Sequence, residues 1–152
     1  MNQVIRVKHL SKDFGDLRAV HQLSFSVGAG QVYGFLGQNG AGKSTTIRML
    51  LTLIRPTEGE IEIFGMDLRK HRKEILRQTG AIIEKPDLYK YLSAKENVRI
   101  FSRLSGVKPT DKQVMDQLAL VGLAERADSK VKTYSQGMKQ RLGLACALIH
   151  NP

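Results

Sequence analysis

The pattern of apolar positions changes character along the chain. In the first 85 residues, short apolar runs separated by turns occupy residues 4–9, 19–27 and 79–84, and such runs predict β-strands. Residues 32–36 are apolar on both faces, which is typical of a central strand buried on both sides. Acidic and apolar residues alternate within residues 56–65, and this alternation predicts a further strand.

Helical spacing of the apolar residues dominates the remainder of the chain. It predicts helices over residues 43–53 and, with a strongly basic composition, over residues 67–78. From Ser93 onward the pattern is entirely helical, with helices expected up to about Ser105, over residues 110–121 and from Ser135. Ser93 followed by Glu96 has the spacing of a capping box. Strands followed by helices indicate an α/β core that carries a helical subdomain.

Residues 37–44 (GQNGAGKS), named here the phosphate loop, match G-x-x-x-x-G-K-[ST] at every fixed position. We expect Gly37, Gly40 and Gly42 to turn the backbone with positive φ, so that its N–H groups approach an anion. Lys43 would bring its charge to the β- and γ-phosphates, and the Ser44 hydroxyl would bind Mg²⁺. The motif predicts nucleotide binding and leaves the kind of NTPase open.

Composition limits the class of protein. The chain has 152 residues, 41% of them hydrophobic and 25% charged, which is typical of one globular domain. It contains no apolar run of membrane-spanning length and begins without an apolar leader, so we expect neither a membrane-spanning nor a secreted protein. The single cysteine, Cys146, excludes an internal disulfide, and its helical spacing with Leu142 and Ile149 predicts a place in the core.

The positive charge is concentrated in the second part of the chain. Of the net charge of +10, residues 1–66 hold seven Lys/Arg and five Asp/Glu (+2), and residues 67–152 hold seventeen and nine (+8). A basic surface can meet nucleic acid, anionic lipid or an acidic protein. The most basic stretch, residues 69–77, lacks interleaved aromatic residues, which favours a solvated helix face over nucleic-acid binding.

Four segments together resemble the ATP-binding subunit of an ATP-binding-cassette (ABC) transporter. They are residues 10–25, the phosphate loop with Thr45, residues 82–98, and residues 134–141 (YSQGMKQR). The resemblance implies a three-layer P-loop NTPase core, with a mixed sheet and antiparallel N-terminal strands, plus an α-helical subdomain. It divides a partial nucleotide-binding domain, residues 1–152, into a core over 1–85, a helical subdomain over 86–134 and a signature helix over 135–152.

The resemblance also implies a set of site residues. Phe14 stands where the family stacks an aromatic ring on adenine, with a core aromatic as the alternative interpretation. Glu84 stands where the family has a glutamine; its carboxylate could contact Mg²⁺ or position water, with a solvated acid as the alternative. The implied nucleotide-binding residues are Phe14, Gly37, Gln38, Asn39, Gly40, Ala41, Gly42, Lys43, Ser44, Thr45, Ser135, Gln136 and Gly137; Lys43 and Glu84 are the implied catalytic residues, and Ser44 and Glu84 the implied metal ligands.

Residues 134–138 resemble the family signature, usually Leu-Ser-Gly-Gly-Gln. Ser135 and Gly137 match it, whereas Gln136 and Met138 depart from it. In the family, this helix end faces the γ-phosphate bound to the other subunit of a head-to-tail dimer; an ordinary capped helix is the alternative. The variant resembles the branch that exports antibiotics and antimicrobial peptides, including bacitracin and lantibiotic systems.

The function implied is to couple binding and hydrolysis of ATP, with Mg²⁺, to export through a separate transmembrane permease. We expect a cytoplasmic protein, peripheral on the inner face of the cell membrane. One alternative is a non-transport ABC protein acting on nucleic acid or the ribosome, which the charge of residues 67–152 mildly favours. A nucleotide-binding module without hydrolysis is the other.

The resemblance covers about the first two-thirds of a cassette. In the family, a strand carrying the Walker B aspartate and the water-polarising glutamate, and later a histidine that contacts the γ-phosphate, follow the position of Pro152. We therefore expect a fragment that binds nucleotide weakly and hydrolyses it poorly, and in which residues 32–36 lack a neighbouring strand.

Overall fold

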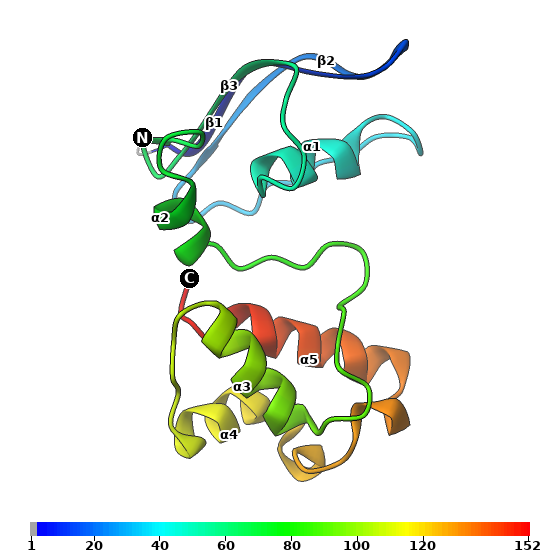
Figure 1. Ribbon diagram of the computed structural model, residues 1–152, viewed down its shortest axis with the longest axis vertical. Helices are drawn as coiled ribbons and strands as arrows, with labels where there is room; N and C mark the ends of the chain where they lie inside the picture. The colour runs from blue at the N-terminus through cyan, green and yellow to red at the C-terminus, as the bar shows by residue number, and fades with distance from the viewer. Residues whose placement is uncertain (1–2) are drawn as a thin grey trace. The chain divides into compact units, whose positions relative to one another are not determined.

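The computed structural model describes residues 3–152, and the chain divides after Leu76 into two compact units. The first unit contains one antiparallel sheet with the strand order β2-β1-β3-β4 (Figure 1). Its strands are β1 (Gln3–Phe14), β2 (Leu17–Gly28), β3 (Glu58–Ile63) and β4 (Met66–Asp67). The strands predicted within residues 4–9, 19–27 and 56–65 are thus confirmed.

Two helices pack against this sheet. They are α1 (Lys43–Leu50), which follows the phosphate loop, and the short α2 (Arg72–Arg77), which covers only part of the helix predicted over residues 67–78. The buried Ile61 and Ile63 of β3 alternate with the exposed Glu60 and the partly exposed Glu62, as the sequence pattern predicts. The buried core of the unit consists of Val7, Leu10, Val20, Met49, Ile61, Ile63, Leu68 and Ile75.

Two of the predicted strands are wrong. Residues 31–38 and 79–83 form no strand, and Val32 and Leu36 are 103% and 92% exposed rather than buried on both sides. A strand needs a hydrogen-bonded neighbour, and within residues 3–152 no strand pairs with either segment. Phe25 of β2 provides partial cover, with its ring centroid 5.5 Å from that of Tyr33 and 5.6 Å from that of Phe35.

The second unit, Arg77–Pro152, is helical. It contains α3 (Ala94–Leu104), α4 (Asp111–Leu120) and α5 (Gln136–Leu148), with the short 3₁₀ turns η1 (Ala124–Arg126) and η2 (Val131–Thr133) between the last two helices. The three helices confirm those predicted from Ser93 onward and pack on one another (Figure 1). Fully buried side chains at their contacts include Val98, Val114, Leu118, Leu123, Val131 and Leu142.

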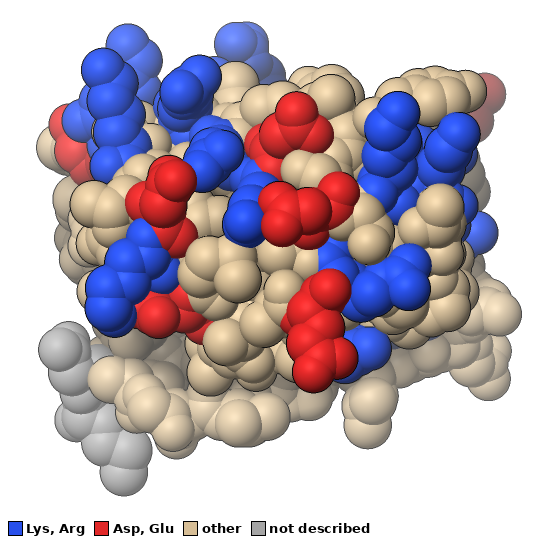
Figure 2. Space-filling view, turned by 90° about the horizontal axis from the view of Figure 1, so that it is seen from below, with Lys and Arg blue, Asp and Glu red and all other residues tan. Residues whose placement is uncertain are grey.

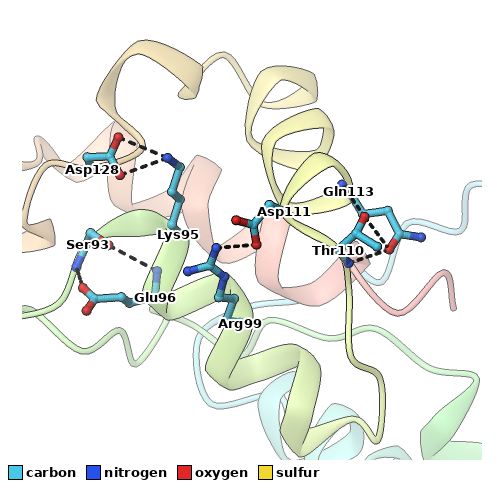
Figure 3. Close-up of polar contacts among 8 residues, drawn as sticks. All are labelled: Ser93, Lys95, Glu96, Arg99, Thr110, Asp111, Gln113 and Asp128. Carbon is cyan, nitrogen blue, oxygen red and sulfur yellow. Dashed lines mark hydrogen bonds and ion pairs between the residues drawn. The ribbon is translucent and has the colours of Figure 1, made fainter.

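Capping boxes fix the starts of α3 and α4 (Figure 3). As predicted, the Ser93 N–H donates to Glu96 Oε2 at 2.6 Å and the Glu96 N–H donates to Ser93 Oγ at 3.2 Å. The Ser93 N–H, and after it the Ser93 side chain, stabilise the Glu96 carboxylate and hold the pKa of Glu96 below its usual range. Thr110 and Gln113 form the same arrangement on α4, and Arg99 of α3 forms an ion pair with Asp111 at 2.6 Å.

A buried amide holds the segment that leads into α3. Asn97 is 0% exposed, and its Oδ1 accepts from the Tyr89 N–H at 2.8 Å. Its Nδ2 donates to the carbonyls of Tyr89 at 3.0 Å and Ser93 at 2.8 Å. One side chain therefore satisfies both main-chain polar groups of Tyr89, and this part of the chain has a defined conformation without regular secondary structure.

Cys146 lies in the helical core, as predicted, with 7% of its surface exposed. Burial raises the pKa of its thiol to about 12. Because the thiolate is the reactive form, we expect Cys146 to react with a disulfide reagent at about pH 8 at least tenfold more slowly in the folded protein than in urea. The reaction is followed by the absorbance of the released reagent. Equal rates for the folded protein and for the protein in urea would contradict a buried thiol.

No helix within residues 3–152 is long and apolar enough to span a bilayer.

Candidate functional site

The phosphate loop leads directly into α1 and is exposed from Gly37 to Ala41. Gly40 and Gly42 have φ values of 86° and 83°, as predicted, and any other residue would be strained there. The prediction for Gly37 is wrong, because Gly37 is not among the residues with positive φ. Its small size matters instead, since an added Cβ would lie 3.3 Å from the Ala41 Cβ.

Gly42 joins the loop to the sheet. A Cβ at this position would lie 2.4 Å from the Ala19 carbonyl oxygen and 2.8 Å from Val20 Cγ2 of β2. The Gly42 carbonyl accepts from the N–H of Thr46 at 2.8 Å and from its buried hydroxyl at 2.9 Å. The absence of a side chain thus brings the loop backbone against β2, and Thr46 fixes it to the first turn of α1.

Positive groups converge on the exposed side of the loop. The Lys43 Nζ donates to the carbonyls of Gly37 and Gln38, both at 2.6 Å, so the side chain curls back over the loop. Gly42, which caps α1, has no side chain, and the first turn of the helix carries no acidic residue. The positive end of the helix dipole is therefore not offset locally, and the Ser44 hydroxyl is exposed beside it. This arrangement suits an anion.

Phe14 lies at the end of β1, and 46% of its surface is exposed. The alternative interpretation as a core aromatic is therefore wrong. The Lys12 Nζ lies 4.8 Å from the centre of its ring. An exposed flat ring suits stacking on a base, and the adenine role stays a prediction.

The second unit holds the remaining predicted residues. Ser135 caps α5 as predicted, because its Oγ accepts from the Met138 N–H at 3.2 Å. Gln136 and Gly137 are exposed, and a Cβ placed on Gly137 would lie within 4 Å of no atom beyond its chain neighbours and the backbone of its own helix. The N-terminus of α5 is therefore open to solvent, with its role toward a phosphate still a prediction.

Glu84 lies in an irregular segment of the second unit, exposed and with φ of 59°. Its proposed roles in catalysis and metal binding stay predictions. Within residues 3–152, no group of three or more His, Cys, Asp or Glu side chains is placed to hold a metal ion.

Sequence reasoning missed the contacts of Arg141 on α5. Its Nη1 donates to the carbonyls of Val121 and Gly122 at 3.3 and 3.2 Å. These carbonyls lie at the C-terminal end of α4, so Arg141 ties the signature helix to its neighbour. The helix predicted over residues 110–121 ends just before Gly122, but the partner of this glycine lies 19 residues later and leaves no periodic signal in the sequence.

Basic and acidic side chains are intermingled on the face shown in Figure 2. Ion pairs such as Lys95–Asp128 at 3.0 Å and Lys112–Asp116 at 2.7 Å occur in the second unit. Paired charges of this kind suit a solvated surface better than a phosphate backbone. The net charge of +8 on residues 67–152 is therefore accompanied by ion pairs rather than gathered into a purely basic patch on this face.

The fold has solved counterparts. A structure of the ATP-binding subunit of an ABC transporter matches with a TM-score of 0.84 at 30% identity, covering 98% of this chain and 63% of that chain. The antiparallel strands, the phosphate loop and the helical unit are thus the parts of an ABC ATPase fold, and the predicted fold class is confirmed. The profile of the ABC transporter family matches residues 20–152, and the chain belongs to this family.

Two curated relatives show which ABC proteins the chain is similar to. The bacitracin transport ATP-binding protein BcrA of Bacillus licheniformis is 48% identical over 100% of this chain and 49% of its own length. The lantibiotic transport ATP-binding protein SrtF of Streptococcus pyogenes is 37% identical over 98% of this chain and 63% of its own length. The chain therefore spans about half the length of the bacitracin relative.

Proposed function

We propose that these residues form the nucleotide-binding part of the ATPase subunit of an ABC exporter, with MgATP bound at the phosphate loop. The observation that carries the proposal is the exposed loop on which the Lys43 ammonium group and the N-terminus of α1 converge. Family membership supports ATP as the nucleotide.

The residues in and around the phosphate loop have distinct proposed roles. The N–H groups of residues 40–45 would donate to the β- and γ-phosphate oxygens, and Lys43 would exchange its two carbonyl partners for phosphate oxygens. Gln38, Asn39 and Ala41 would contact the phosphates through their main chain, and Phe14 would stack on the adenine. The Thr46 hydroxyl donates to the Gly42 carbonyl, so it would hold the loop in one conformation both before and after the nucleotide binds.

Magnesium is the ion proposed to accompany the nucleotide. Ser44 offers an exposed hydroxyl oxygen, a hard ligand of the kind that Mg²⁺ prefers, and Glu84 is the second proposed ligand. The bound ion would neutralise charge on the β- and γ-phosphates. Glu84 is also the proposed residue for positioning water at the γ-phosphate.

The open N-terminus of α5 supports a role in a dimer. The N–H groups of Gln136 and Gly137 and the Ser135 hydroxyl would donate to the γ-phosphate held by a second ABC subunit, arranged head to tail. ATP would then close the dimer, and its hydrolysis would reopen it. Such a subunit would act beneath a transmembrane permease, at the cytoplasmic face of the cell membrane.

The cargo proposed is an antibiotic or antimicrobial peptide. The similarity to the bacitracin and lantibiotic transport proteins supports this choice. Transport and hydrolysis are proposed for a protein that contains these residues together with the remaining length found in the relatives.

The test is a titration of the folded chain with MgATP, compared with the Lys43→Ala variant. We expect the dissociation constant to rise at least tenfold, because the variant loses the ammonium partner of the phosphates (about 1.4 kcal/mol for a factor of ten). Lys108→Ala, which removes an exposed lysine from the second unit, should leave binding unchanged. Equal affinity of all three proteins, at unchanged circular dichroism, would refute the proposed site.

A further inference from the structure

The first unit contains a cavity of about 670 Å³ that no phosphate-loop residue lines. It lies between the C-terminal end of α1, the turn that follows, β3 and the residues before α2. Its floor is apolar, with Met49, Ile61 and Leu68 buried to 6% exposure or less. A volume of this order is typical of sites for small molecules.

Three arginines, Arg55, Arg69 and Arg72, line the same cavity. Arg72 Nε donates to Thr52 Oγ1 at 2.7 Å, and Arg69 Nη2 donates to the Gly59 carbonyl at 2.8 Å. A guanidinium group has five N–H donors, so each of these bonds orients a side chain and leaves most of its donors available. Within residues 3–152, Arg55 makes no hydrogen bond or ion pair.

The cavity also contains two carboxylates, Glu60 and Asp67. Asp67 Oδ1 accepts from the main-chain N–H groups of Arg69 at 2.8 Å and Lys70 at 3.2 Å, and these bonds hold the pKa of Asp67 below its usual range. Asp67 therefore fixes the backbone that carries Arg69. In the described part of the chain, no ion pair joins either carboxylate to the three arginines.

Thr52 lies in the turn that ends α1, where its N–H donates to the Met49 carbonyl at 3.1 Å and the Leu53 N–H donates to the Arg48 carbonyl at 2.9 Å. The φ of Thr52 is 60°, a conformation that a β-branched residue adopts only under strain. Its hydroxyl is the acceptor that orients Arg72. The helix end sets the backbone of Thr52, and the hydroxyl of Thr52 in turn positions one of the arginines of the cavity wall.

We propose that this cavity binds a phosphate monoester, in addition to the nucleotide at the phosphate loop. Guanidinium groups match the geometry of phosphate and bind it through paired N–H donors. Arg69, Arg72 and Arg55 bind the phosphate, and the apolar floor receives the organic group esterified to it. The same chemistry is carried by a free phosphorylated metabolite or by the headgroup of an anionic lipid such as phosphatidic acid.

The test uses the Lys43→Ala variant, so that nucleotide-loop binding is weakened, and follows main-chain amide signals by NMR during titration. The probes are phenyl phosphate, inorganic phosphate, and vesicles of phosphatidylcholine with or without phosphatidic acid. We expect phenyl phosphate to shift the amides of Thr52, Gly59 and Arg69, and to bind at least threefold more tightly than inorganic phosphate. Association only with vesicles containing phosphatidic acid, with the same amides perturbed, identifies the lipid headgroup as the source. Perturbation confined to residues 37–45, or none with any probe, overturns the proposal.

Variants separate this cavity from the proposed nucleotide site. In the otherwise unchanged chain, the double variant Arg69→Gln/Arg72→Gln should weaken phenyl phosphate binding at least tenfold and leave MgATP binding unchanged. Lys43→Ala should weaken MgATP binding and leave phenyl phosphate binding unchanged. The double variant Arg103→Gln/Lys108→Gln removes the same two charges from exposed positions of the second unit and should change neither. Thr52→Gly should weaken phenyl phosphate binding without lowering the melting temperature. Unchanged phenyl phosphate affinity in the double variant, with the protein folded, refutes the proposal whatever the outcome for ATP.

Discussion

Replacing Gly42 with alanine is expected to lower the free energy of unfolding of the first unit by about 4 kcal/mol. The new methyl group would overlap the Ala19 carbonyl at 2.4 Å and Val20 Cγ2 at 2.8 Å, and the residue would keep a φ of 83°. Either β2 and the loop separate or the loop changes conformation, so MgATP binding should be lost with stability. Urea unfolding followed by circular dichroism, together with the ATP titration, measures both effects.

Two further variants isolate the cause. Gly40→Ala has nearly the same φ, 86°, but no atom within 4 Å of the new Cβ, so it should cost about 1 kcal/mol. Adding Val20→Ala to Gly42→Ala removes the side-chain overlap and leaves the Ala19 carbonyl in place, so it should restore little stability. Two results would contradict a close approach of the Gly42 backbone to the Ala19 carbonyl. One is full recovery of stability when Val20→Ala is added, and the other is an equal loss of stability in Gly40→Ala and Gly42→Ala.

Asn97→Ala is the second substitution with a large expected effect, a loss of about 3 kcal/mol in the second unit. The N–H of Tyr89 would lose its partner, the Tyr89 carbonyl would keep only the Leu92 N–H at 3.2 Å, and the space left by the fully buried amide would be empty. Hydrogen exchange should show the specific consequence, because the Tyr89 amide would lose its protection before the amides of α3. Urea unfolding gives the magnitude.

Ser102→Ala is the matched control on the same helix. Ser102 is also 0% exposed, but its hydroxyl donates only to the Arg99 carbonyl of its own helix at 2.8 Å. Its loss should cost about 1 kcal/mol or less and leave exchange at Tyr89 unchanged. If the two variants are equally unstable, the bonds from Asn97 to Tyr89 do not hold the segment.

Local signals predicted the chain most accurately. The cap at Ser93 depends on Glu96, three residues away, and is found as predicted. The glycine turn before α1 is similarly encoded within eight residues, and Gly40 and Gly42 have the expected backbone. At these places, the atoms that determine the geometry belong to residues adjacent in sequence.

Predictions that depend on a distant partner were less accurate. The apolar run of residues 32–36 indicates a preference for burial but specifies no neighbouring strand, and the segment is irregular and exposed. Gly37 shows a related limit, since sequence does not distinguish a glycine needed for its φ from one needed for its size. The contact of Arg141 with the end of α4 depends on helix packing, which periodicity does not specify.

The spacing of the capping contacts bears on the order in which the molecule assembles. The Glu96–Ser93 bond closes over three positions, whereas the Arg6–Glu62 bond between β1 and β3 joins residues 56 positions apart. Contacts between near neighbours form fast, and those that close long loops form slowly. We therefore expect α3 and α4 to form helical turns before β3 pairs with β1. The pairing of β3 should then determine the folding rate of the first unit.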